Sequence, residues 1–178
     1  GIAVSRPGAA NLAIVRELVS DIVVVPEADI ERAALMLLEV EKTVVEGAGA
    51  AGLAALLHRP DRFAGRAVGL ILSGGNIDAR MLSSIVLRGL VREGRMMRVR
   101  VEITDAPGNL AQVAQIIGEA GANIVEVYHE RAFSSLPIKS AALVVVVETR
   151  NATHGQDMLE RLAAAGFPAR PLDAAENI

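Results

Sequence analysis

The chain contains no cysteine and no tryptophan, and only 2% of its 178 residues are aromatic. The lack of cysteine excludes disulfides, thiolate catalysis and zinc sites built on cysteine. The three histidines, His58, His129 and His154, form no metal-ligand pair at helical spacing, so we expect no metal site. With 52% hydrophobic residues, the core must consist of alanine, valine, leucine and isoleucine, which favours a globular fold over disorder.

The charge pattern and the hydropathy restrict the possible partners. The 18 basic and 21 acidic residues are mixed along the chain and give a net charge of −3. There is no basic stripe and no aromatic stacking platform, which argues against nucleic acid as a partner. No apolar run reaches the ~18 residues that a membrane span needs, and no signal peptide is visible. We therefore expect a cytoplasmic protein with no nucleic-acid or membrane partner.

Residues 1–94 alternate between helical and extended patterns, which is typical of an α/β fold. Apolar spacing predicts helices at 12–19, 29–41, 46–57 and 78–91, the second of them capped by Asp29. Short apolar runs at 21–26, 43–45 and 67–72 predict buried strands. The polar stretch at 92–95 marks a boundary, which gives domains 1–94 and 95–178.

Glycines open the third of these helices in a pattern that has two interpretations. Gly47, Gly49 and Gly52 match the dinucleotide fingerprint G-x-G-x-x-G. No acidic residue ends the next strand to hold a ribose, so a small-residue helix packed closely on a sheet is favoured over nucleotide binding.

Ser73 follows that next strand, in the turn Ser73-Gly74-Gly75-Asn76. The carboxyl ends of strands form the edge where α/β sheets place ligands, and a serine hydroxyl can make a hydrogen bond there. No G-x-S-x-G elbow or positioned histidine accompanies Ser73, which disfavours a nucleophilic role. A plain loop serine remains the alternative.

Residues 96–172 carry a βαββαβ pattern, which is typical of the α+β ferredoxin-like fold. Strands are predicted at 96–104, 123–130, 140–149 and 169–172, and helices at 110–120 and 153–165, the second capped near Asn151 or Thr153. The valines at 144–147 place apolar side chains on both faces of the sheet. The face without helices therefore needs cover, and a second copy of the domain is a natural partner.

The turn from Asp105 to Leu110 joins the first of these strands to its helix. Pro107 and Gly108 force a turn, and Asn109 is expected to cap the helix. The helix N-terminus presents unpaired N–H groups to a small anion such as an amino-acid carboxylate, and Gly108 leaves room for it. A helix cap without a ligand is the alternative. Further on, the amide of Asn123, with Ile124 beside it as an apolar wall, is expected to meet the same ligand.

These residues carry a resemblance to two known modules. Residues 96–172 resemble an ACT domain, a regulatory module that binds small molecules, through the turn 105–110 and the segments 122–125, 129–131 and 148–149. Ala106 stands where that turn commonly has Arg or Lys. Residues 1–94 are similar to the C-terminal part of the catalytic domain of threonine dehydratase (threonine ammonia-lyase), through segments 1–4, 21–23, 45–51 and 72–78.

The second resemblance implies a partial fold-type II segment of an enzyme that uses pyridoxal phosphate. The family removes water and then ammonia from threonine to give 2-oxobutanoate, the first step toward isoleucine. It implies that Ser73 bonds the pyridine nitrogen of the cofactor, with Glu46 and Gly1 lining the pocket. The family's Schiff-base lysine and phosphate loop are absent, since Lys42 and Lys139 are the only lysines and neither lies in such a motif. We therefore expect no catalytic residue in this chain and no dehydratase activity from it alone.

The first resemblance implies an effector site and an assembly. The effector would be an amino acid, most plausibly isoleucine or valine, bound where two ACT domains meet in a homodimer or tetramer. Its candidate ligands are Asp105, Gly108, Asn109, Leu110, Asn123 and Ile124. Two other functions stay open, namely a free-standing amino-acid-binding regulatory protein and, from the three glycines alone, a nucleotide-dependent oxidoreductase.

Overall fold

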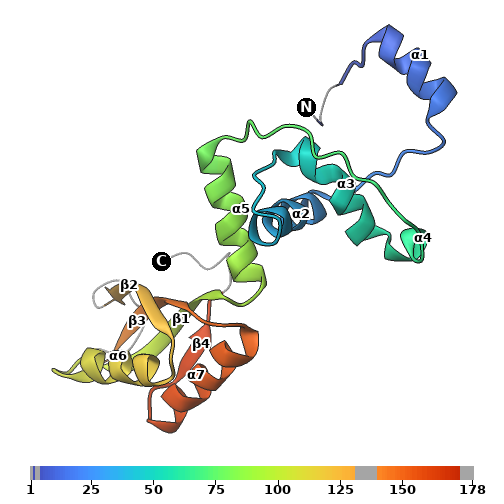
Figure 1. Cartoon of the computed structure of the whole chain (residues 1–178). Coiled ribbons are helices and arrows are strands. Elements are labelled where there is room, and N and C mark those ends of the chain that lie inside the picture. Colours follow the sequence, from blue (N-terminus) through green and yellow to red (C-terminus); the bar gives the residue numbers. More distant parts are fainter. Residues whose placement is uncertain (1, 3–4, 131–139, 173–178) are drawn as a thin grey trace. The chain divides into compact units, whose positions relative to one another are not determined.

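The computed structural model describes residue 2 and residues 5–130 and 140–172. It forms two compact units, Gly1–Gly89 and Leu90–Ile178, whose elements are labelled in Figure 1. None of the helices in the described ranges has both the length and the apolar character that a membrane span requires.

Helices form the first unit. They are α1 (Ala9–Leu18), α2 (Glu27–Glu39), α3 (Gly47–His58), the single turn α4 (Pro60–Phe63) and α5 (Ala79–Arg92), whose last residues belong to the second unit. Small residues dominate the contact between α2 and α3, which lets the two helices approach closely. The buried members of this core are Ala33, Ala34, Leu37, Val45, Ala50 and Ala54.

The strands expected at 21–26, 43–45 and 67–72 are not formed in this unit, so that prediction was wrong. These segments run extended, but no described segment pairs with them in a ladder. Val45 is buried in the core of the unit, but other apolar side chains of these segments are exposed, with 84% of Val24 and 88% of Ile71 accessible to solvent. A strand needs a hydrogen-bonded neighbour as well as a β-branched sequence, and the described part of this unit supplies none.

The start of α2 also differs from expectation. Pro26 occupies the N-cap position, so Asp29 lies inside the first turn and does not cap the helix. Its carboxylate instead lies 2.9 Å from Nδ1 of His58 at the end of α3. Asp29 therefore joins the two helices that form the core of the unit.

The second unit has the expected order of elements. It contains β1 (Met96–Thr104), α6 (Asn109–Glu119), β2 (Asn123–Glu130), β3 (Ser140–Glu148), α7 (Ala152–Ala164) and β4 (Ala169–Pro171). The sheet is antiparallel with strand order β2-β3-β1-β4. This confirms the ferredoxin-like βαββαβ fold. Helices α6 and α7 lie on the same side of the sheet (Figure 1).

The core of this unit lies between the two helices and the sheet. Alternate residues of β1 and β3, among them Val101 and Leu143, are fully buried against Ile117 of α6 and Leu162 of α7. The predicted Asn151 cap is confirmed, because its side-chain oxygen accepts the N–H of His154 at 2.9 Å.

The other face of the sheet carries apolar side chains, as the valines of β3 predicted, together with charged ones. Ala142 and Val144 are fully buried on it, and charged side chains of the neighbouring strands flank them. Arg100 of β1 forms a half-buried ion pair with Glu130 of β2, with 2.6 Å between the nitrogen and the oxygen. Ionic side chains thus lie on both sides of the apolar centre of this face.

His154 is a buried polar link between the two helices. Its Nδ1 accepts the Arg150 N–H at 3.0 Å, and its Nε2 lies 2.8 Å from the Ala120 carbonyl at the end of α6. The ring is therefore neutral with the proton on Nε2, since Nδ1 acts as an acceptor.

We expect His154→Leu to destabilise the second unit by about 1–3 kcal/mol, because two buried backbone groups lose their partner. The single tyrosine, Tyr128, lies in this unit, so its fluorescence during urea titration follows the unit selectively. Thr153→Leu, an exposed neighbour in the same helix turn, is the control. Equal midpoints for both variants would contradict this role of His154.

Candidate functional site

The loop around Ser73 is held against the start of α3. The Glu46 N–H donates to the Gly74 carbonyl at 2.9 Å, immediately before the helix begins. Gly74 has a positive φ of 80°, and a Cβ there would overlap the Glu46 carboxylate. The backbone on both sides of the Ser73–Gly74 bond is therefore fixed by close contact with α3 and the residue preceding it.

Gly49 and Gly52 make this contact possible from the helix side. A Cβ on Gly49 would overlap the Ser73 carbonyl oxygen, and one on Gly52 would lie 3.2 Å from the Leu70 side chain. The glycines of the apparent dinucleotide fingerprint thus have a packing role. They lie inside α3, and no strand precedes them among the described residues.

Ser73 is the residue of this loop whose hydroxyl can bond a cofactor. Ser73 is exposed, and within the described ranges its side chain makes no hydrogen bond. Glu46 is half-buried beside Gly74, while Gly1 lies outside the described residues. A free hydroxyl on a rigid loop fits the role of a hydrogen-bond partner for the ring of pyridoxal phosphate.

The two lysines do not add to this site. Nζ of Lys42 donates to the Glu39 carbonyl at 2.6 Å, just beyond the end of α2. Lys139 lies outside the described residues.

A second candidate site lies at the turn between β1 and α6. A hollow of about 400 Å³ opens there, lined by Ile103, Asp105, Ala106, Pro107, Gly108, Leu110 and His129. Gly108 has a φ of 96°, and the space where a Cβ would stand is open. Three predicted ligand residues, Asp105, Gly108 and Leu110, therefore line one hollow.

Asn109 has a different role from the one expected. Gly108 is the N-cap of α6, and no side chain caps the helix, so the prediction of an Asn109 cap was wrong. The Asn109 amide instead donates to the Thr104 carbonyl at 2.7 Å. Asn109 thus closes the turn onto the end of β1 and does not line the hollow.

Asn123 and Ile124 lie at the opposite end of the sheet from this hollow. Asn123 pairs with Glu148 and donates its amide to that carboxylate at 3.0 Å, whereas Thr104, just before the turn, pairs with Ser140. Eight residues of β3 separate the two ends, which is about 26 Å at ~3.3 Å per residue. One copy of the chain therefore does not bring all the predicted ligand residues together.

His129 is the one ionisable side chain lining the hollow that the sequence-based set of ligands lacked. It is the second-last residue of β2 and lies beside the turn in the folded sheet. The preceding residue, Tyr128, points to the opposite face, where its hydroxyl donates to Glu126 at 2.8 Å. That hydrogen bond to a carboxylate raises the pKa of Tyr128. The sequence signal for His129 was its place at the end of a strand otherwise rich in valine and isoleucine.

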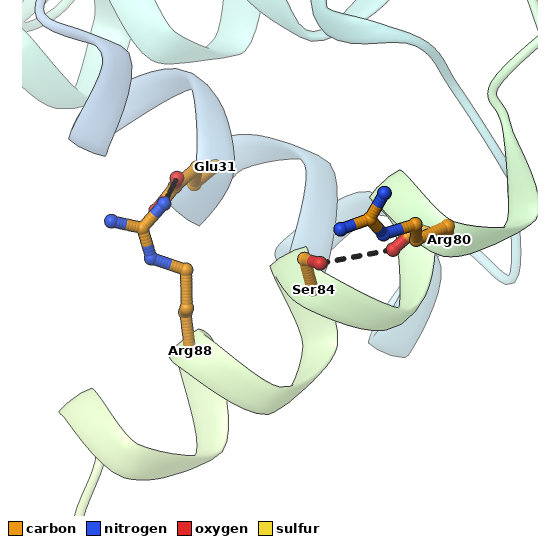
Figure 2. A network of polar contacts seen from close by, with 4 residues as sticks. All are labelled: Glu31, Arg80, Ser84 and Arg88. Carbon is orange, nitrogen blue, oxygen red and sulfur yellow. Dashed lines mark hydrogen bonds and ion pairs between the residues drawn. The ribbon is translucent and has the colours of Figure 1, made fainter. Parts of the chain in front are cut away.

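A groove of about 460 Å³ between α2 and α5 contains none of the predicted site residues. Figure 2 shows its polar contacts, in which Arg88 pairs with Glu31 at 2.9 Å and the Ser84 hydroxyl donates to the Arg80 carbonyl at 3.0 Å. Arg88 is 68% exposed, so its ion pair adds little stability. No group of three potential metal ligands occurs in the part of the chain that the structure describes.

We expect Gly49→Ala to lower the melting temperature of the chain and Gly52→Ala to leave it unchanged or raise it slightly. Both changes favour the helix by up to ~1 kcal/mol, but only the first forces a Cβ against a backbone oxygen. Thermal unfolding followed by far-ultraviolet circular dichroism compares the two. A Gly49→Ala protein at least as stable as Gly52→Ala would show that the Ser73 loop is free to move away.

The chain is similar to known proteins along most of its length. Residues 1–74 match the family described as pyridoxal-phosphate dependent enzymes. Over 168 residues, 94% of this chain, it is 45% identical to the L-threonine ammonia-lyase of Geobacter sulfurreducens, and over 170 residues it is 39% identical to that of Thermotoga maritima. The chain spans 42% of the length of each of these relatives.

Among solved structures, the ACT domain from the GTP pyrophosphokinase of Chlorobium tepidum aligns with 43% of this chain and 96% of its own length. Its identity is 14% and its TM-score is 0.36. The fold of the second unit is therefore assigned from its own strand order and register. The similarity along nearly the whole chain confirms its resemblance to threonine ammonia-lyases, and pyridoxal phosphate is the cofactor that the family match implies for the intact enzyme.

Proposed function

We propose that this chain is the C-terminal segment of a threonine ammonia-lyase that converts threonine to 2-oxobutanoate and ammonia, and that its second unit binds a regulatory amino acid. The observation that carries the catalytic part is the Ser73 loop. Its backbone is fixed against α3, and its hydroxyl is left available. The similarity to two L-threonine ammonia-lyases over almost the whole chain supports the choice of reaction.

Ser73 would bond the ring nitrogen of pyridoxal phosphate, and Glu46 would line the same pocket. The cofactor, when bound, withdraws electrons from the α-carbon of the substrate. A neutral hydroxyl accepts or donates one hydrogen bond but does not hold a proton on the ring as a carboxylate does. Ser73 thus moderates the electron withdrawal, which favours elimination of the β-hydroxyl over reactions that need a fully protonated ring.

In the intact enzyme, we expect Ser73→Ala to weaken cofactor binding and lower turnover, because a buried ring nitrogen loses its partner at a cost of roughly 1–3 kcal/mol. Cofactor affinity is measured by absorbance titration, and turnover by 2-oxobutanoate formation. Ser83→Ala, an exposed serine of α5, is the matched control. Unchanged affinity and rate in Ser73→Ala would leave Ser73 as a loop residue only.

The regulatory part of the proposal rests on the hollow beside the turn 105–110. The first turn of α6 offers N–H groups to a carboxylate, and Asp105 offers a carboxylate to an ammonium group. Ile103 and Leu110 add apolar walls for an aliphatic side chain. This combination suits an α-amino acid such as isoleucine or valine.

A second copy of the chain would bring Asn123 and Ile124 to the same effector. Strand β2 is an edge strand, and Val125, Val127 and Tyr128 on it are each at least 40% exposed. An edge strand of this kind can pair with its own copy in antiparallel direction. Such pairing places the start of β2 of one copy beside the end of β2 of the other, where the hollow lies.

We expect calorimetry on this chain to show binding of isoleucine or valine in preference to serine and threonine. Gly108→Val should abolish the binding, because a side chain fills the open space at a position with positive φ. Gly118→Ala, in an open position on the same helix, should bind as the wild type does. No heat from any of the four amino acids, or wild-type affinity in Gly108→Val, would show that the effector does not bind at this turn.

A free-standing amino-acid-binding regulatory protein is the competing function. A regulator of this kind would need only the hollow of the second unit, whose lining residues all lie between Ile103 and His129. The encoding reading frame separates the two functions. About 200 or more upstream codons that include a lysine site of the family support the enzyme, and a start codon directly before Gly1 supports the regulator.

A further inference from the structure

His129 interrupts an otherwise apolar surface. In the register of the sheet it pairs with Leu143, which pairs in turn with Val101, so the three lie on the face that α6 and α7 cover. On that face β1 and β3 carry only methionine, valine, isoleucine, leucine and alanine, and β2 carries Ile124 and Val127 in addition to His129. His129 is therefore the one ionisable side chain among the described residues of this face.

The other two histidines have evident structural partners. His154 is buried with both ring nitrogens in hydrogen bonds, and His58 lies 2.9 Å from Asp29. His129 is exposed, and within the described ranges it has no such bond. A histidine that stabilises the fold would be expected to resemble the first two.

The ring of His129 lies at the hollow that the turn forms. Pro107 and Gly108 line the same hollow, and their backbone leads directly into the first turn of α6. A carboxylate that meets the N–H groups of this turn is thus within the same small volume as the imidazole. Either a neutral or a protonated imidazole can donate an N–H to a carboxylate oxygen.

We propose that His129 donates a hydrogen bond to the carboxylate of the effector and is thereby a specificity-determining residue of the regulatory site. This inference rests on the proposed amino-acid-binding function and adds a residue to it. Asp105, in the same hollow, takes the ammonium group, so the two side chains together select a ligand that carries both charges. Compounds without a free carboxylate lose the contribution of His129.

The test compares two ligands on two proteins by calorimetry. Isoleucine and isoleucinamide, which lacks the carboxylate, are titrated into the full chain and into His129→Ala. For isoleucine, we expect about tenfold or greater weakening in the variant, as for the loss of a hydrogen bond to a charged group. For isoleucinamide, the two proteins should bind about equally.

A matched variant and a spectroscopic signal complete the experiment. Gln115→Ala alters an exposed residue of α6 that does not line the hollow and should bind isoleucine as the wild type does. The ring nitrogen signals of His129 in NMR spectra should shift on addition of isoleucine, while those of His58 stay in place. Equal weakening of isoleucine and isoleucinamide in His129→Ala, or an unshifted His129 ring, overturns the role of His129 alone. No heat from isoleucine with the wild type overturns the proposed regulatory function and this inference together.

Discussion

The pairing of β3 with its two neighbours, β1 and β2, determines where the candidate ligand residues of the second unit lie. Nine consecutive residue pairs, from Met96 with Glu148 to Thr104 with Ser140, fix the register of the sheet. A shift by one residue would turn Val99 and Val101 away from the helices and bring Arg98 and Arg100 into the core. The same register places the turn 105–110 at one end of the sheet and Asn123 at the other.

How much of the structure could be predicted from the sequence differs between the two units, for a physical reason. In the second unit, strand and helix periods are strong, and each strand finds its neighbour within the same unit, so local pattern and final structure agree. In the first unit, residues 21–26 and 67–72 have the composition of buried strands but remain extended without a ladder. A ladder needs a neighbouring strand as well as a β-branched sequence, and a local pattern cannot show whether that neighbour is there.

The errors at individual side chains have a similar origin. Asp29 and Asn109 are both residue types that favour helix N-caps, yet each makes a different contact. Asp29 bonds His58, 29 residues away, and Asn109 bonds back to the Thr104 carbonyl. Propensity describes which hydrogen bonds a side chain can make at a helix start, whereas the tertiary structure determines which partner lies within reach. The glycines of α3 show the same point, since their pattern fits a nucleotide site but Gly49 packs on the Ser73 loop and Gly52 on Leu70.

Under the proposed function, the positions of the predicted effector residues constrain how regulation operates. If all of them lay in one copy, an amino acid could bind an isolated domain and leave its assembly unchanged. Because Asn123 lies about 26 Å from the turn in the same sheet, by ~3.3 Å per residue, a ligand that contacts both must bridge two copies. Effector binding and dimerisation are then coupled by a single free energy. The effector therefore strengthens dimerisation by the same factor by which dimerisation strengthens effector binding. The exposed edge of β2, with Val125 and Val127 on it, is the surface on which this linkage depends.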